Sequence, residues 1–218
     1  DIKLYYIEYF DYFMNQKNSL GLNACFMDLK DPLELFKLWM IEAEKKEISD
    51  PNAFSLATVD SKGRPNVRMI LLKGYGTEGF VFYTNLNSPK SHELGTNSRA
   101  AICFHWKSLQ RQVRILGNVK QVNDKEADIY FDSRSYESKI GAWASDQSST
   151  IKKRTELLNR IEDIKKKYNK SVPRPPHWSG WSLNPLSIEF WLHKENRNHE
   201  RLVYNKITKG WKKNILYP

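Results

Sequence analysis

Three donor side chains, Arg197, His199 and Arg201, are spaced two residues apart near the C-terminal end of the chain. In an extended strand, side chains at every second position share a face, so this spacing predicts a row of donors. The guanidinium groups can bind a phosphate or another anion, and the ring between them can stack on a flat ligand or move a proton. A solvated edge strand with mixed charges explains the same residues. The function of this row therefore depends on the ligand that the rest of the chain can bind.

A second candidate anion site lies in the link over residues 85–94. Ser88 as the N-cap and Pro89 at the first helical position predict a short helix whose free N–H groups and dipole favour a phosphate. Lys90 adds a positive charge at the same end. An ordinary capped helix is the alternative interpretation.

Two predicted strands carry polar groups among apolar neighbours. Arg68 and Lys73 lie five positions apart, so in a regular strand they face opposite sides, and buried basic groups need partners. Gln112 and Arg114 share a face of a later strand, and an amide can read both the donors and the acceptors of a heterocycle. Cross-strand pairing is the alternative for this second pair.

The next constellation is Tyr130, Arg134 and Ser138, at positions i, i+4 and i+8. If one helix runs through them, they form a polar stripe suited to three oxygens of a phosphate. Residues 133–135 (SRS) can instead be a break between two helices. Residues 147–149 (QSS) precede a long amphipathic pattern and are predicted to be its N-cap.

Composition limits the possible classes of function. The net charge of +10 suits an anionic partner, but the lysine runs have the pattern of solvated helix faces, which argues against nucleic acid as the partner. No apolar stretch is long enough to cross a bilayer. Cys25 and Cys103 stand in unlike contexts, which predicts no metal site and a reduced cytoplasmic protein. Because no nucleophile–base pattern, metal spacing or glycine-rich phosphate loop is present, a bound cofactor is expected to supply the chemistry.

The remaining pattern predicts an α+β protein that is mainly antiparallel sheet, in a meander or barrel. Asp31 and Pro32 predict a helix start, and this helix should end before Asp50. Residues 31–218 are predicted to form a single domain after an N-terminal segment, 1–30, for which mobility is one reading. Strands are expected over 53–59, 66–75, 79–86, 99–106, 111–122, 187–193, 200–205 and 211–216. Further helices are expected over 124–132, 136–144 and 149–168, with a proline-rich loop and residues 178–181 before the late strands.

Several short motifs occur together in one order: 68–73 (RMILLK), 82–85 (FYTN), 111–113 (RQV), 140–143 (IGAW), 147–149 (QSS), 188–191 (IEFW) and 197–201 (RNHER). In this order and spacing the chain resembles the pyridoxine/pyridoxamine 5′-phosphate oxidase family, from about Asp31 to the C-terminus. The resemblance implies a homodimeric split β-barrel with FMN bound where the two subunits meet. It also implies no membrane and no nucleic acid as a partner.

The resemblance assigns roles to individual residues. Arg197 and His199 are the implied catalytic positions, placed against the pyridine ring of the substrate. The implied substrate-binding residues are Lys73, Tyr130, Arg134, Ser138, Arg197 and His199. The implied FMN-binding residues are Arg68, Met69, Ile70, Leu71, Leu72, Lys73, Tyr83, Thr84, Lys90, Gln112, Gln147, Ser148, Trp191 and Arg201, some of them from the partner chain.

The implied reaction is oxidation of pyridoxamine or pyridoxine 5′-phosphate by O2 to pyridoxal 5′-phosphate, with H2O2 released and ammonia from the amine. A protein that binds FMN or pyridoxal phosphate on the same barrel without turnover is the alternative. The chain departs from the family pattern at Pro89, where the family has an arginine before the lysine. An Arg-Glu-Tyr element that covers the substrate has no clear match over residues 15–30, and the C-terminal residues 214–218 also differ.

Overall fold

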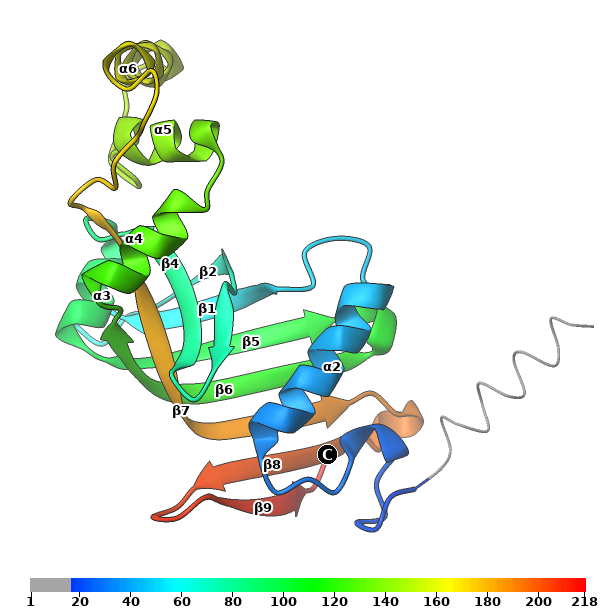
Figure 1. Cartoon of the computed structure of the whole chain (residues 1–218). Helices are drawn as coiled ribbons and strands as arrows, with labels where there is room; N and C mark the ends of the chain where they lie inside the picture. The colour runs from blue at the N-terminus through cyan, green and yellow to red at the C-terminus, as the bar shows by residue number, and fades with distance from the viewer. Residues whose placement is uncertain (1–16) are drawn as a thin grey trace, which may run out of the picture. The chain divides into compact units, whose positions relative to one another are not determined.

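Strands make up most of the regular structure in this computed structural model, which describes residues 17–218 (Figure 1). The expected mobility of the N-terminal segment, 1–30, therefore lies outside the described residues for its first sixteen positions and stays a prediction. The strands are β1 (Ala53–Val59), β2 (Pro65–Leu71), β3 (Gly74–Gly76), β4 (Gly79–Asn85), β5 (Arg99–Trp106), β6 (Arg111–Gln121), β7 (Trp178–Leu192), β8 (Glu200–Lys206) and β9 (Trp211–Leu216). The α-helices are α2 (Pro32–Lys46), α3 (Pro89–Thr96), α4 (Asp124–Asp132), α5 (Tyr136–Ala144) and α6 (Arg154–Lys167).

The strands of the described part form one sheet in the order β2-β1-β5-β6-β7-β4-β3, with β8 paired to β7 and β9 paired to β8. The pairs β3–β4, β4–β7, β7–β8 and β8–β9 are all antiparallel. Antiparallel neighbours can be joined by short turns, which is why strand follows strand along the chain. The predicted mainly antiparallel class with flanking helices is confirmed.

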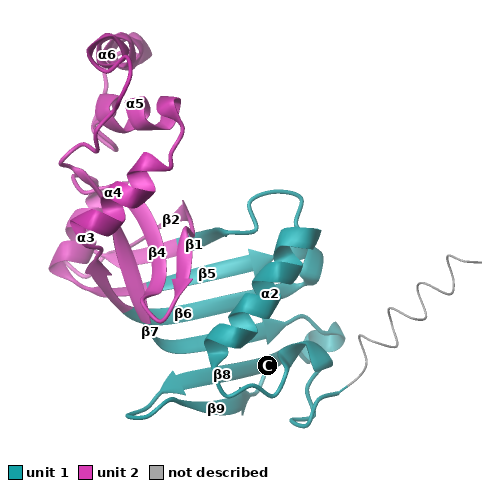
Figure 2. Ribbon diagram, viewed as in Figure 1, with its two compact units in different colours: residues 1–55, 101–117, 185–218 teal, residues 56–100, 118–184 magenta. Residues whose placement is uncertain are grey.

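The chain divides into two compact units, coloured separately in Figure 2. Within the described part, unit 1 comprises residues 17–55, 101–117 and 185–218, and unit 2 comprises residues 56–100 and 118–184. The single domain over residues 31–218 stays a prediction.

Unit 1 has an aromatic core beneath α2. Asp31 caps this helix by accepting a hydrogen bond from the Leu33 amide at 2.9 Å, and Pro32 occupies its first turn, as predicted. The fully buried Trp39 packs edge-on against Phe190 of β7, with 5.1 Å between ring centroids. The Trp39 indole N–H donates to the Cys25 carbonyl at 2.7 Å. These contacts fasten α2 and the segment before it to the sheet.

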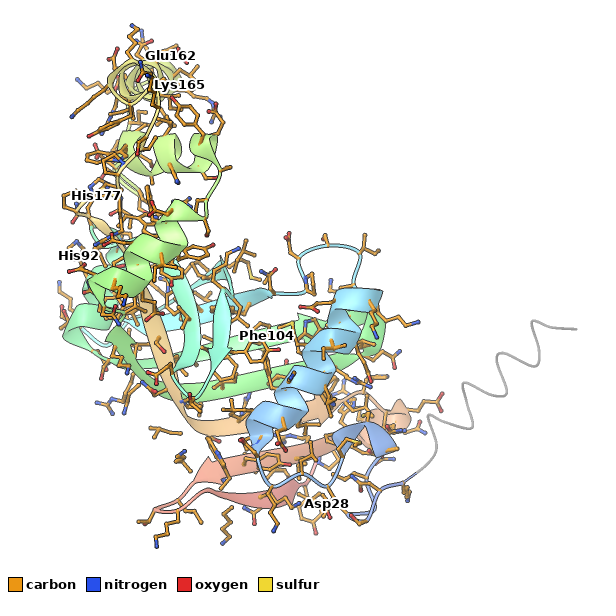
Figure 3. All side chains as sticks on the ribbon, in the orientation of Figure 1. Asp28, His92, Phe104, Glu162, Lys165 and His177 are labelled. Carbon is orange, nitrogen blue, oxygen red and sulfur yellow. The ribbon has the colours of Figure 1, made fainter. Side chains whose placement is uncertain are left out.

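Unit 2 contains α3 to α6, β4 and the first half of β7. Tyr83 of β4 stands opposite Gly180 of β7 in the strand register. Helices α5 and α6 are joined by an ion pair at 3.3 Å between Glu137 and Lys165, the latter labelled in Figure 3. The Tyr136 hydroxyl adds a bond to the Tyr168 carbonyl at 3.0 Å.

Three predicted boundaries are wrong. The expected strand over 66–75 is broken at Leu72 and Lys73, because the Lys73 amide leaves the first strand to bond the Val81 carbonyl at 2.8 Å. The helix expected from residue 149 begins at Arg154, because Ser148 has a left-handed φ of 69° and the Ser149 amide closes a turn onto Asp146. Residues 178–181, expected before the late strands, are the start of β7.

Candidate functional site

A cavity of about 550 Å³ opens in unit 2 and gathers many of the residues singled out in the sequence. Its lining draws on the end of β2, on β4, on α4, α5 and the link between them, on the segment after α5, and on the start of β7. The predicted residues that line it are Met69, Ile70, Leu71, Lys73, Tyr83, Thr84, Tyr130, Arg134, Ser138 and Gln147. Lining residues that sequence reasoning missed are Asn85, Gly141, Ala142, Ser145 and Trp178.

Arg134 and Lys73 are the cations that line this cavity, and Arg134 is held against its aromatic residues. Its guanidinium carbon lies 4.8 Å from the centre of the Trp178 ring and 5.6 Å from that of Phe131. The buried Nη1 atom has no hydrogen-bond partner among the described residues, and no ion pair of that part of the chain includes Arg134. Burial lowers the pKa of Arg134 from its ordinary value. A desolvated guanidinium with an unmet donor is suited to an anionic ligand.

Three aromatic rings form a stack beside that guanidinium. The rings of Tyr83 and Tyr130 lie 4.0 Å apart at an angle of 11°, and Tyr83 and Trp178 lie 5.3 Å apart at 5°. A Cβ atom on Gly180 would lie 2.7 Å from Cδ1 of Tyr83, so only glycine leaves room for this ring. Burial raises the pKa of Tyr83 to about 12.

Tyr130, Arg134 and Ser138 meet the same cavity, although the single helix that would align them does not exist. Helix α4 ends at Asp132, and Ser135 starts α5 as its N-cap, accepting from the Ser138 amide. The prediction that one helix aligns these three side chains is therefore wrong. The break turns the chain between the two helices and still leaves all three side chains on the cavity wall.

Helix α5 forms one side of the cavity, and His177, labelled in Figure 3, contacts this helix. Its Nε2 atom lies 3.1 Å from the Ala142 carbonyl, and its own carbonyl accepts from the Leu86 amide at 2.7 Å. The Trp143 indole N–H donates to the Pro173 carbonyl at 2.7 Å. The segment before β7 thus holds the C-terminal half of α5 in place.

Lys90 lies buried behind the lining and contacts it through hydrogen bonds. Its Nζ atom donates to Thr84 Oγ1 at 3.1 Å, to Gln147 Oε1 at 2.9 Å and to Ser88 Oγ at 3.0 Å. Burial, reinforced by the charge of Arg68, lowers the pKa of Lys90 to about 8. The predicted helix start at Pro89 is confirmed, but the Ser88 hydroxyl makes no cap bond and donates to the Asn85 carbonyl at 2.7 Å.

Besides Lys90, three predicted cofactor residues of unit 2 do not line the cavity. Arg68 pairs with the buried Glu93 at 3.3 Å and donates to Thr58 Oγ1 at 2.5 Å. Leu72 is 5% exposed and belongs to the core. Ser148 is exposed in the turn before α6. The partner carboxylate Glu93 was missed because nothing in the spacing of residues 68 and 93 connects them.

The other predicted residues belong to unit 1, where the row from Arg197 to Arg201 is not one extended strand. Strand β8 begins at Glu200, and Arg197 ends a short helical turn with a left-handed φ of 59°. Asn196 before it also has a positive φ, 54°, so the chain curls where the period-two argument assumed extension. The predicted shared face of Arg197, His199 and Arg201 is therefore wrong.

His199 instead packs with aromatic neighbours. Its ring centroid lies 4.6 Å from that of Trp191 and 5.1 Å from that of His193. The Lys194 amide donates to its Nδ1 atom at 3.2 Å, so Nδ1 is the acceptor and Nε2 carries the proton in the neutral ring.

Arg201 stands opposite Trp191 in the register of β7 and β8. Its guanidinium pairs with Glu189 at 2.8 Å, and the same carboxylate pairs with Arg114 at 2.8 Å. Gln112 lies half-buried on β6, two residues from Arg114. Glu189, which sequence reasoning gave no role, is thus the common anchor of two cations.

No helix of the described residues is long and apolar enough to span a membrane. Both cysteines are free thiols.

Comparison with known proteins identifies the family. The family model described as pyridoxamine 5′-phosphate oxidase matches residues 40–168. A second one, described as the pyridoxine 5′-phosphate oxidase C-terminal dimerisation region, matches residues 178–218. The chain is 62% identical over 208 residues to the pyridoxine/pyridoxamine 5′-phosphate oxidase of Pelagibacter ubique (strain HTCC1062), covering 94% of this chain and 100% of that protein. It is 50% identical over 190 residues to the protein of that name from Caulobacter vibrioides (strain NA1000 / CB15N), covering 87% and 86%.

Two solved structures have a similar fold. PhzG from Burkholderia lata 383, in complex with tetrahydrophenazine-1-carboxylic acid, superposes with a TM-score of 0.85 at 27% identity, covering 94% of this chain and 100% of that one. A pyridoxamine 5′-phosphate oxidase-related, FMN-binding protein from Nostoc punctiforme PCC 73102 gives a TM-score of 0.70 at 16% identity, covering 88% and 100%, which is a likeness of fold alone. The predicted split-barrel class is confirmed, and the chain belongs to the pyridoxine/pyridoxamine 5′-phosphate oxidase family.

Proposed function

We propose that this chain catalyses the oxidation of pyridoxamine or pyridoxine 5′-phosphate by O2 to pyridoxal 5′-phosphate, with FMN as cofactor. H2O2 is the second product, and the amine substrate also releases ammonia. The observation that carries the proposal is the unmet Nη1 donor of Arg134 in a cavity bordered by Tyr130, Ser138 and Lys73.

These four side chains are the proposed site for the substrate phosphate. Arg134 supplies a planar fork of donors, Lys73 a mobile point charge, and the two hydroxyl groups of Tyr130 and Ser138 further bonds. The stack of Arg134 on Trp178 removes freedom from the guanidinium before the ligand arrives. Less entropy is then lost on binding, so the donor carbon of the substrate can be held in one orientation.

The residues around the cavity also fit FMN, which is a planar heterocycle carrying a phosphate. Lys90 is a buried cation whose hydrogen-bond partners are all neutral oxygens, and it stands in the first turn of α3, where N–H groups and the helix dipole favour an anion. Arg68, Thr84, Gln147 and the strand end 69–71 are proposed to complete this part of the FMN site. Bound FMN supplies two-electron oxidation of the substrate, with O2 as the final acceptor.

The residues of unit 1 keep the roles that the family implies, as proposals. Arg197 and His199 are proposed to position the substrate ring, and Gln112, Trp191 and Arg201 to contact FMN. The Nδ1 atom of His199 is occupied by the Lys194 amide, so its Nε2 atom is the one left to face a ligand. The dimerisation region matched at residues 178–218 supports a homodimer as the working unit.

The proposal is tested by comparing pyridoxamine 5′-phosphate with unphosphorylated pyridoxamine on the FMN-loaded protein. Consumption of O2 should depend on the substrate phosphate, with kcat/KM higher by at least about a hundredfold for the phosphorylated amine, since several charge-assisted bonds are lost without it. Equal rates for both amines, or no oxidation of either, would contradict the proposal.

A further inference from the structure

Helix α3 holds a buried carboxylate that the proposed FMN site does not include. Glu93 is 8% exposed. It accepts hydrogen bonds from the Thr58 hydroxyl, from Asn66 Nδ2 at 2.6 Å and from Arg68 Nη2 at 3.3 Å. A buried carboxylate is unfavourable unless donors surround it, and here three side chains from β1 and β2 do so.

The same network fixes the direction of Arg68. Its Nη1 atom donates to Thr58 Oγ1 at 2.5 Å and to the Leu56 carbonyl at 3.2 Å, while Nη2 reaches Glu93. Thr58 is itself bonded to Glu93, so the guanidinium is held by a closed set of contacts. An arginine on the half-exposed strand β2 would otherwise keep much of its rotamer freedom.

Glu93 also acts on the second cation of this region. It lies one helical turn after Lys90, whose hydrogen bonds all go to neutral oxygens. Arg68 lowers the pKa of Lys90, whereas the charge of Glu93 raises it and so opposes the larger effect of burial. Two cations and one carboxylate leave a local charge of plus one, which favours an anion.

We propose that Glu93 is a positioning residue for the FMN phosphate, which it serves by fixing the direction of Arg68 and by supplying a counter-charge between Arg68 and Lys90. This inference rests on the proposed function, because it takes FMN as the ligand. A carboxylate near an anion site would by itself repel the phosphate. Glu93 therefore favours FMN indirectly, through its interactions with Arg68 and Lys90.

The experiment titrates flavin-stripped full-length protein with FMN and with riboflavin, which lacks the phosphate, and follows the quenching of flavin fluorescence from pH 6.5 to 9. The Glu93→Gln variant keeps the shape of the side chain and removes its charge. We expect its Kd for FMN to rise by about tenfold or more, the size of one lost charge-assisted interaction, while its Kd for riboflavin stays within about twofold. The alkaline loss of FMN affinity should begin at lower pH than in the wild type.

Two further variants serve as controls for the side-chain charge and for the position of the carboxylate. Glu93→Asp retains the charge with a shorter reach and should recover the wild-type pH profile with an intermediate FMN affinity, which also serves if Glu93→Gln does not fold. Glu162→Gln, an exposed carboxylate on α6, should bind both flavins like the wild type.

A merely structural role predicts that Glu93→Gln weakens FMN and riboflavin equally, and that result would overturn the inference, as would unchanged binding of both. The proposed function fails separately: FMN-loaded wild-type protein would then leave pyridoxamine 5′-phosphate unoxidised, whatever Glu93 does.

Discussion

Arg134 lies with its guanidinium carbon 4.8 Å over the ring of Trp178, while its buried Nη1 atom has no partner among the described residues. One face of the cation is therefore satisfied by an aromatic ring and one edge is left for a ligand. This relationship joins the link between α4 and α5 to the start of β7, two segments that are far apart in the sequence.

The planar fork of Arg134 should matter more than its charge. Arg134→Lys keeps the charge but loses the paired donors, so we expect kcat/KM for pyridoxamine 5′-phosphate to fall by about 10- to 100-fold. Steady-state rates of O2 consumption measure this, with unphosphorylated pyridoxamine as the matched control. An equal loss for both amines would show that Arg134 does not act on the phosphate.

Trp178 should act through Arg134. Trp178→Leu removes the ring under the guanidinium, and we expect KM for the phosphorylated amine to rise by about 3- to 30-fold, corresponding to a cation–π contribution of roughly 0.5–2 kcal/mol. Trp178→Phe keeps a ring and should restore most of the affinity. If kcat falls in both variants while KM stays constant, the ring has another role.

Gly180 should be required for the position of Tyr83. A Cβ atom at this position would lie 2.7 Å from Cδ1 of Tyr83 and 2.9 Å from the Phe82 carbonyl oxygen, which belongs to the backbone and cannot move aside. We expect Gly180→Ala to destabilise the protein by about 1–3 kcal/mol, as overpacking does, with Tm lowered by roughly 2–4 °C per kcal/mol. Gly95→Ala is the matched control, because its Cβ would meet nothing within 4 Å. Similar melting temperatures for the two variants would refute the steric argument.

The lowered pKa of Lys90 predicts a pH dependence of FMN binding. Lys90 is cationic below its pKa of about 8 and loses its charge as the pH rises through that value. The phosphate carries its second negative charge above about pH 6, so affinity should be level from about pH 6 to 8 and fall by up to about tenfold per unit above that. Titrations of wild-type protein and of Lys90→Met test this. The variant should bind more weakly without the alkaline fall, and an unchanged fall would assign it to another group.

The local sequence correctly predicted those helices and strands whose ends are marked by capping residues or turns. Asp31 and Pro32 mark the start of α2, and residues 53–59 and 211–216 form strands over the expected ranges. Gly180 shows why the start of β7 was missed: glycine weakens a strand pattern, and its reason for being there is the ring of Tyr83 on another strand. A close contact between residues of two different strands cannot be read from the local sequence pattern.

Many residues that line the cavity were predicted from the sequence, but the arrangement of these residues was not. Tyr130, Arg134 and Ser138 meet one cavity across a helix break, and Arg197 leaves the extended row through a left-handed turn. Glu93 and Glu189, which fix Arg68 and Arg201, are non-local partners. The pairing of charges depends on tertiary structure, which spacing along the chain does not reveal.

The most direct test of the account is the stoichiometry of turnover by the FMN-loaded wild-type protein with pyridoxamine 5′-phosphate. O2 consumption, H2O2 release and the absorbance of pyridoxal 5′-phosphate are followed together. Equal amounts of all three are expected, with ammonia formed in the same amount. A protein that retains FMN and binds the amine, yet consumes no O2 in its presence, would contradict this account and leave a binding protein on the same fold.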